Sequence, residues 1–268
     1  MAVNALHSAA TGMNALSTEL DVISNNLANV NTNAFKASRV NFEDLFYLQK
    51  RQPGLESGQE TTPTAGLQVG LGTRISNTHY DFGQGSLKAS PGDFDMAITG
   101  DGFFQVDILE EYGGGKGYTR AGNFAVNRDN ELVLGNSDGP RLSAGITVPS
   151  DAVGFDISSD GIITATFSDG STAEAGQLEL HGFVNKAGLK SIGGNIYVET
   201  EISGPATSGI PGEGAMGTIK HKFIETSNVS PVNELVQLIK TQRAFEMNSQ
   251  TIQAADELLQ TVGNLRRF

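Results

Sequence analysis

Apolar residues near the N-terminus recur at alternating spacings of four and three, and mostly polar residues stand between them. This is the a/d pattern of a heptad repeat, which places one apolar stripe along an α-helix. The stripe continues over about four heptads, which favours a coiled coil, although an amphipathic helix on an ordinary core gives a similar pattern. The residues expected to make contacts are Leu6, Ala9, Met13, Leu16, Leu20, Ile23 and Leu27.

A second long helix is predicted at the other end of the chain, from about Pro231 to Leu265. Ser230 or Asn228 can cap it, and Pro231 suits a first helical turn. A helix of this length spans roughly 50 Å, which is long for a globular protein. Two heptad helices at opposite chain ends most simply pack on each other. The expected contact residues of the second helix are Leu238, Phe245, Ile252, Leu259 and Val262, with Thr241, Asn248 and Ala255 between them.

The chain between the helices is expected to be β-structure. The Asn-rich run at 24–33 should end the first helix, because Asn is a poor helix former that accepts left-handed backbone angles. From Thr73 to Glu225, short apolar runs alternate with Gly and Asp-Gly turns. Residues 127–130 read as a hairpin loop, and residues 162–167 read as a strand between two Asp-Gly turns.

The stretch from Gln49 to Gly72 is rich in Gly, Thr, Gln and Pro and has no clear period. It is either a flexible surface loop or an extended arm that becomes ordered against a neighbour. The predicted fold class is therefore α+β, with the N- and C-terminal helices paired as a coiled coil, a central all-β domain and an extended connecting arm. The predicted domains are residues 1–36 with 226–268 (helical), 37–75 (arm) and 76–225 (β-rich).

Composition and motifs argue against catalysis. The 268-residue chain has no Cys, which excludes disulfides, thiol nucleophiles and Cys-based zinc sites. The run Gly113–Gly117 lacks the first Gly and the Ser or Thr of a phosphate-binding loop. No metal, cofactor, catalytic or small-molecule site is therefore expected. The four histidines stand apart from any ligand pair and are expected to have surface or packing roles: His7, His79, His181 and His221.

Charge and hydropathy limit the possible partners and compartment. The net charge of −12 argues against nucleic-acid binding and against adhesion to anionic lipid. No segment approaches the ~20 apolar residues of a membrane span. The N-terminal segment also lacks the basic and apolar regions of a signal peptide. The protein is therefore expected either to stay in the cytoplasm or to leave by a route without a cleaved signal.

Two further motifs stand at the ends of the predicted helices, the first from Ile23 to Lys36 and the second in 225–248. They resemble the signatures of flagellar basal-body rod and hook proteins and occur in the expected order. Ala34 stands where a small residue or Gly usually precedes Phe-Lys in these signatures. The residues that carry the resemblance are Ser24, Asn25, Asn26, Leu27, Asn29, Asn31, Phe35, Lys36, Thr226, Ser227, Asn228, Val229, Arg243 and Ala244.

The resemblance implies a structural subunit of the rod, a drive shaft that crosses the periplasm and passes torque from motor to hook. The segments 42–47, 51–54, 66–72, 102–106 and 118–124 resemble members that form the distal part of the rod. The implied partners are further copies in a helical homopolymer, proximal rod proteins, the hook protein, the outer ring proteins and the flagellar type III export apparatus.

Three alternatives remain open at the level of sequence. A proximal rod member of the same family is the nearest. A secreted β-rich enzyme such as a peptidoglycan hydrolase would need a paired acid and base, and no motif nominates one. A cytoplasmic coiled-coil scaffold would explain the helices but not the end motifs. Heptad stripes at both ends of a chain without a catalytic motif favour a protein that assembles with other copies. Contacts between copies that do not close into a ring build a filament.

Overall fold

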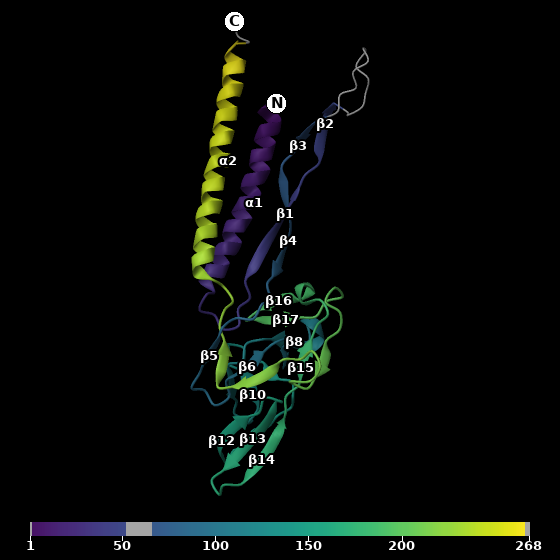
Figure 1. The fold of residues 1–268 in the computed structure, drawn as a ribbon, viewed down its shortest axis with the longest axis vertical. Coiled ribbons are helices and arrows are strands. Elements are labelled where there is room, and N and C mark those ends of the chain that lie inside the picture. The colour runs from purple at the N-terminus through teal and green to yellow at the C-terminus, as the bar shows by residue number, and fades with distance from the viewer. Residues whose placement is uncertain (1, 52–65, 266–268) are drawn as a thin grey trace. The chain divides into compact units, whose positions relative to one another are not determined.

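The described part of the chain, residues 2–51 and 66–265 of a computed structural model, forms two units, each assembled from segments distant in sequence (Figure 1). Residues 2–28, 38–51, 66–80 and 230–265 form one unit, here called the helical unit. Residues 29–37 and 81–229 form the other, here called the β unit. This division differs from the predicted one, because residues 29–37 and 226–229, expected in the helical domain, make their contacts with the β strands.

The elements of the helical unit come from the two ends of the chain and from the stretch after the first motif. They are α1 (Ala2–Ala28), β1 (Ser38–Asp44), β2 (Tyr47–Arg51), β3 (Leu67–Gly70), β4 (Thr73–Tyr80) and α2 (Pro231–Leu265).

The β unit contains short strands and two 3₁₀ turns. They are β5 (Leu87–Ala89), β6 (Met96–Thr99), β7 (Phe104–Asp107), η1 (Gly113–Gly115), β8 (Lys116–Thr119), β9 (Phe124–Val126), β10 (Leu132–Leu134), β11 (Arg141–Leu142), β12 (Ala152–Ile157), β13 (Ile162–Phe167), β14 (Thr172–Gln177), β15 (Leu180–Gly182), η2 (Lys186–Gly188), β16 (Lys190–Gly193), β17 (Ile196–Val198), β18 (Thr207–Gly209), β19 (Thr218–His221) and β20 (Phe223–Glu225).

Both predicted helices are present, and α1 ends within the Asn-rich run as the sequence indicates. The carbonyl of Ser230 accepts the first hydrogen bond of α2, from the Glu234 amide at 3.0 Å, so Ser230 occupies the N-cap position. Asn228, the other candidate cap, uses its side chain elsewhere, on the backbone of Ala37 and Asp81. Among the described residues, no helix is apolar and long enough to cross a membrane.

The two helices lie side by side and run antiparallel (Figure 1). Asn26 Nδ2 lies 3.4 Å from Glu234 Oε2, Thr241 Oγ1 lies 3.2 Å from Glu19 Oε2, and Gly12 faces the side chain of Asn248. These contacts recur at seven-residue steps in opposite directions, as a heptad pattern requires. The pairing of the helices is therefore confirmed, whereas a supercoiled coiled coil stays a prediction.

The stretch predicted as an extended arm is an antiparallel β-ribbon. β1 pairs with β4 from Ser38↔Tyr80 to Asp44↔Thr73, and β2 pairs with β3 beyond them. Most ribbon side chains are exposed, so neither face shows the period-two apolar pattern that reveals a strand in a sequence. Part of the predicted arm, residues 52–65, lies outside the described residues.

The ribbon packs on a side of α1 that the heptad pattern does not include. Ala15 is only 3% exposed although it lies off the predicted stripe, and it lines a small groove with Leu45 and Ile75 of the ribbon. The helix α1 is therefore covered on two faces, by α2 and by the ribbon.

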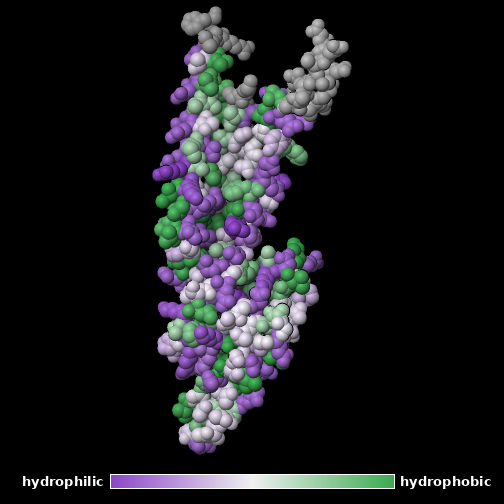
Figure 2. Space-filling model, in the orientation of Figure 1, coloured by the Kyte–Doolittle hydropathy of each residue, from purple (hydrophilic) through white to green (hydrophobic). Residues whose placement is uncertain are grey.

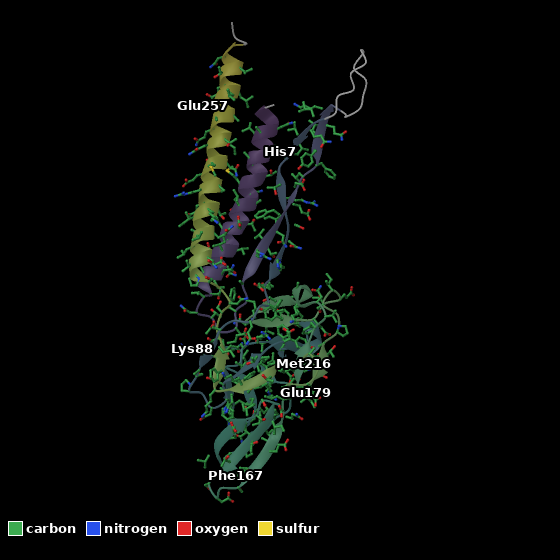
Figure 3. The ribbon with its side chains drawn as sticks, viewed as in Figure 1. His7, Lys88, Phe167, Glu179, Met216 and Glu257 are labelled. Carbon is green, nitrogen blue, oxygen red and sulfur yellow. The ribbon has the colours of Figure 1, made fainter. Side chains whose placement is uncertain are left out.

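The β3–β4 turn is hydrogen-bonded to side chains of α1. The His7 ring nitrogen Nδ1 lies 3.0 Å from the Leu71 carbonyl oxygen (Figure 3), and the Thr73 amide donates to Thr11 Oγ1 at 3.4 Å. Gly72 has φ +114°, and a Cβ there would lie 2.1 Å from Thr11 Oγ1. Only glycine satisfies both the backbone angle and the close approach.

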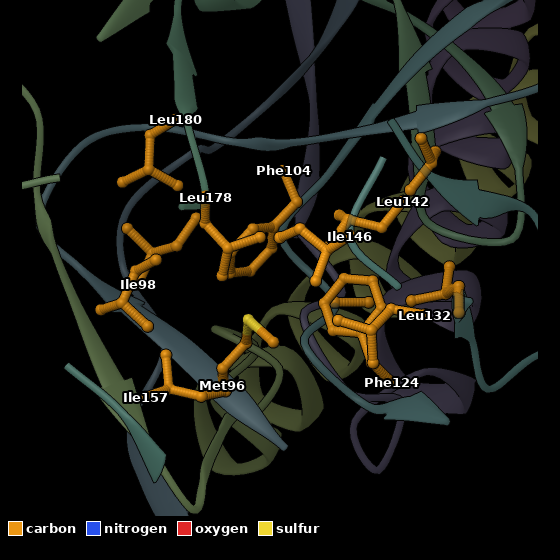
Figure 4. Packing of buried hydrophobic residues seen from close by; sticks show 14 of the residues in the cluster. Met96, Ile98, Phe104, Phe124, Leu132, Leu142, Ile146, Ile157, Leu178 and Leu180 are labelled. Carbon is orange, nitrogen blue, oxygen red and sulfur yellow. The ribbon is translucent and has the colours of Figure 1, made fainter. Parts of the chain in front are cut away.

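Within the described residues, seven strands of the β unit form one sheet in the order β16-β17-β8-β7-β11-β10-β9, and β12, β13 and β14 form a smaller sheet. The predicted hairpin at 127–130 and the predicted strand at 162–167 are confirmed. The core lies between these sheets and the paired strands β6 and β19; Figure 4 shows Met96, Phe104, Leu132 and Leu178 packed within it.

Gly72→Ala should destabilise the helical unit, by about 2 kcal/mol or more, because it adds a clash to backbone strain. Gly139→Ala is the control, since Gly139 also has positive φ but has no atoms within 4 Å of an added Cβ. Thermal unfolding followed by far-ultraviolet circular dichroism measures both. Equal losses in the two variants would show that the contact with Thr11 is unimportant.

Candidate functional site: the helix faces and the end motifs

Most of the predicted heptad residues are buried or half-buried within the helical unit, in which α1 packs against α2. On α1, Ala9 and Ile23 are buried and the rest of the predicted set is half-buried. On α2, Thr241 and Ala255 are buried, and Leu238 and Ile252 are half-buried.

Three predicted residues of α2 are exposed within this chain: Phe245, Leu259 and Val262. The helix α2 has 35 residues and α1 has 27, so the two cannot match along their full length. The seven-residue contact steps place the start of α1 opposite about residue 258 of α2. Leu259 and Val262 therefore lie on an overhang of α2 that α1 does not cover.

A second apolar row runs along α2, away from the α1 contact. Val232, Leu235, Val236 and Ile239 follow one another at helical spacing, and each is at least 46% exposed. Figure 2 shows hydrophobic surface gathered along this part of α2. The heptad pattern does not include this row, although its spacing of three and four is visible in the sequence.

Asn26 of the first motif joins α1 to the start of β1 within the helical unit. Its Nδ2 donates to the Ser38 carbonyl at 2.9 Å, and its Oδ1 accepts from the Ser38 amide at 3.0 Å. The side-chain amide thus takes the place of a neighbouring strand for Ser38. This explains why a polar residue, Asn26, is only 2% exposed at this position. Around it, Ser24, Asn25 and Asn31 are exposed, and Leu27 and Asn29 are half-buried.

Lys36, at the end of the first motif, is fully buried in the β unit. Its Nζ lies 2.6 Å from Glu225 Oε1 and donates to the Gly83 carbonyl at 2.8 Å. Arg120 Nη1 lies 3.5 Å from the other oxygen, Glu225 Oε2, and Arg120 Nε donates to the Gly102 carbonyl. Burial lowers the pKa of the Lys36 ammonium, and the charge of Glu225 opposes that shift. The result is one buried anion between two buried cations.

The second motif holds the first within the β unit. Asn228 Oδ1 accepts from the Ala37 amide at 2.7 Å, and its Nδ2 donates to the Asp81 carbonyl at 2.7 Å. The Asn228 amide donates to the Phe35 carbonyl, and Thr226 Oγ1 donates to the Ser86 carbonyl at 2.9 Å. Val229 is buried and Ser227 half-buried, whereas Arg243 (exposed) and Ala244 (half-buried) lie on α2.

The backbone angle and burial of Ala34 explain why a small residue or Gly usually precedes Phe-Lys in this motif. Its φ is +56°, in the left-handed region, its amide donates to the Glu225 carbonyl at 2.8 Å, and it is 1% exposed. A position with these angles and so little space favours glycine or a very small side chain.

Sequence reasoning gave no role to Glu225 or Arg120. Glu225 follows the apolar pair Phe223-Ile224 as the first residue of the second motif, and a charged residue next to an apolar pair is the signal that could have identified it. Arg120 lies in the Tyr118–Phe124 segment, where no sequence pattern marks its burial.

The histidines make structural contacts. His221 lies between Asp156 and the Asp93 carbonyl, His79 contacts Asn41, and the His181 ring packs on Tyr118. No group of His, Asp and Glu within the described residues could hold a metal ion.

Three family models match the chain. They are a flagella basal body rod protein model (residues 6–36), a flagellar hook protein FlgE/F/G D1 domain model (97–165) and a flagellar basal body rod FlgEFG protein C-terminal model (220–265). These matches include both end motifs and part of the core of the β unit. They define a structural protein of the flagellar rod and hook type, and not an enzyme.

The full-length relatives are more specific. The flagellar basal-body rod protein FlgG of Buchnera aphidicola (Schizaphis graminum) is 42% identical over 95% of this chain and 96% of its own. FlgG of Borreliella burgdorferi is 39% identical over 99% of both chains, and FlgG of Bacillus subtilis is 38% identical over 99% of this chain and 100% of its own. The chain belongs to the family of the flagellar basal-body rod protein FlgG.

Hook proteins are more distant. The flagellar hook protein FlgE of Escherichia coli is 40% identical over 44% of this chain and 29% of its own. Among solved structures, the hook protein FlgE2 of Helicobacter pylori aligns with 71% of this chain and 43% of its own at 15% identity. Its TM-score of 0.24 is too low to support an argument about the fold.

Ala34→Val should destabilise the β unit by more than about 2 kcal/mol, because a β-branched side chain at positive φ in a closed site adds both strain and overlap. Ala34→Gly should stay within about 1 kcal/mol of the parent, since relief of strain offsets the lost methyl group. Ala173→Val on the exposed face of β14 is the control. Urea unfolding followed by the near-ultraviolet tyrosine signal measures all three, and a harmless Ala34→Val would contradict the strain argument.

His181 should make the stability of the β unit depend on pH. Burial, chiefly, lowers the pKa of His181, and Lys116 adds to this while Glu179 opposes it. The unfolded chain therefore binds the proton more readily than the folded one, and the free energy of unfolding should fall as pH drops below about 6.5. In His181→Gln this part of the fall should disappear. Parallel losses in parent and variant between about pH 7 and 5 would exclude His181 as the cause.

Proposed function

We propose that the chain is a structural subunit of the distal part of the flagellar rod, which polymerises helically and transmits torque from the motor to the hook. Membership of the FlgG family supports the rod assignment. The proposal that the chain polymerises rests on the second apolar row of α2, because a rod subunit needs apolar surface that its own fold leaves uncovered.

The uncovered surface of α2 suits contacts between copies. Val232, Leu235, Val236 and Ile239 form a continuous apolar strip, and apolar surface gains about 25 cal/mol per Å² when it leaves water. The overhang beyond α1 adds Leu259 and Val262 at one end of the helix pair only. Contacts between two different surfaces of the subunit generate a filament when the rotation from one copy to the next does not close into a ring.

The remaining partners are proposals that follow from a place in the rod. Proximal rod proteins lie below and the hook protein above, outer ring proteins surround the shaft where it crosses the periplasm, and the subunit reaches it through the type III export apparatus without a cleaved signal. The exposed predicted residues Phe245, Leu259 and Val262 are proposed to contact neighbouring copies, whereas the α1 heptad residues act within the chain. A proximal rod position is the alternative.

Leu235→Asp should abolish assembly without unfolding the monomer, because the side chain is half in water within the chain but would be desolvated between copies. Val262→Asp on the overhang should act in the same way. Gln242→Asp, an exposed polar position of α2, is the control. Sedimentation of concentrated protein and electron microscopy measure the assemblies, and circular dichroism checks the fold.

Expression in a bacterium whose own FlgG gene is deleted tests the same variants in cells. The parent and Gln242→Asp should restore swimming, and the two Asp variants at apolar positions should not. Variants that assemble and swim like the parent would remove the role assigned to the α2 surface. Gold labelling of isolated basal bodies separates the two rod positions, since label next to the hook supports the distal part and label at the motor end supports the proximal alternative.

A further inference from the structure

We infer that Lys36 and Glu225 form a latch, which closes the β unit only when the segments 29–37 and 222–229 are both in place. The two residues stand 189 positions apart and meet with both side chains fully buried. Each belongs to a segment that continues directly into a long helix, Lys36 after α1 and Glu225 before α2.

Three segments of the chain meet at this pair. The Ala34 amide donates to the Glu225 carbonyl, the Gly85 amide donates to Glu225 Oε1 at 2.8 Å, and Lys36 Nζ donates to the Gly83 carbonyl. A Cβ at Gly85 would lie 2.0 Å from the Thr226 carbonyl oxygen, so the backbones are in direct contact. The pair therefore fastens 34–36 and 83–85 to the start of the second motif.

The chemistry of the pair makes its closure all-or-none. A buried ammonium without its carboxylate pays the cost of leaving water without the attraction that offsets it, and the carboxylate without that ammonium loses one of its two nearby cations. A state in which only one segment has docked is thus disfavoured. Such a pair contributes little net stability compared with apolar residues, and its value lies in specifying which segments must come together.

Because of Arg120, the loss of Glu225 and the loss of Lys36 should have unequal effects on the latch. Its Nη1 is the cation near Glu225 Oε2, an oxygen that has no hydrogen-bond partner among the described residues. Without Lys36, Glu225 and Arg120 still balance each other. Without Glu225, two buried cations face each other with no anion between them. Loss of the Glu225 charge should therefore open the latch more than loss of the Lys36 charge.

The latch acts within one chain, so its test is separate from that of the proposed function. Hydrogen exchange by mass spectrometry is measured on the full-length variants Lys36→Met, Glu225→Gln and the double variant. We expect amides in 29–37 and 81–86 to exchange at least about tenfold faster in both single variants, and faster in Glu225→Gln than in Lys36→Met. Residues 96–106 and 162–167 should keep their protection. The double variant should open less than the two single effects combined.

Lys186→Met is the matched control, because it breaks a pair with Asp101 in which both side chains are partly exposed. It should leave exchange in 29–37 unchanged. Unchanged exchange in 29–37 of Lys36→Met would overturn the latch. An equal rise throughout the core would overturn it as well, because the pair would then be a general core element. A larger effect in Lys36→Met than in Glu225→Gln would overturn the part assigned to Arg120.

Discussion

The antiparallel packing of α1 on α2 is the constraint on which the rest of the arrangement depends. It brings residues from the two ends of the chain into contact and sets a seven-residue register that runs from Asn26 and Glu234 to Gly12 and Asn248. Once that register is set, the difference in helix length must appear at one end only. The overhang and its uncovered apolar side chains are thus a direct result of where the two helices begin and end.

Much of this could be predicted from sequence, because the signals are local. Spacings of four and three predict both helices, Pro231 and the Asn-rich run predict their ends, and Gly-containing turns predict hairpins such as 127–130. The ribbon could not be predicted, because the burial of its strands does not alternate regularly along the chain and few of its side chains are fully buried, although one side packs on α1. Ala15 illustrates the same limit, since only the packed ribbon explains its burial.

The end motifs were recognisable as a resemblance, but their physical role was not. Asn26, Lys36 and Asn228 are polar residues, and sequence patterns place polar residues at surfaces. In the structure Asn26 and Asn228 satisfy backbone groups near the Ala37–Ser38 peptide, one in each unit, and Lys36 balances a buried carboxylate. These roles depend on partners far away along the chain, and no local pattern reports them. The role of the predicted contact residues between copies stays a prediction.

Most of the β unit, residues 81–229, is an insertion between the ribbon, which ends at Tyr80, and α2, which begins at Pro231, whereas its residues 29–37 lie between α1 and the ribbon. Residues 81–229 form no part of the contact between the two helices or of the ribbon. A β module of different size could therefore be exchanged at this point without altering the helices. The exchange would have to respect two conditions: the new module would start after Gly85 and return the chain to Glu225, within reach of Lys36, and it would supply a cation in place of Arg120. Length variation among relatives should accordingly fall between these two fixed points.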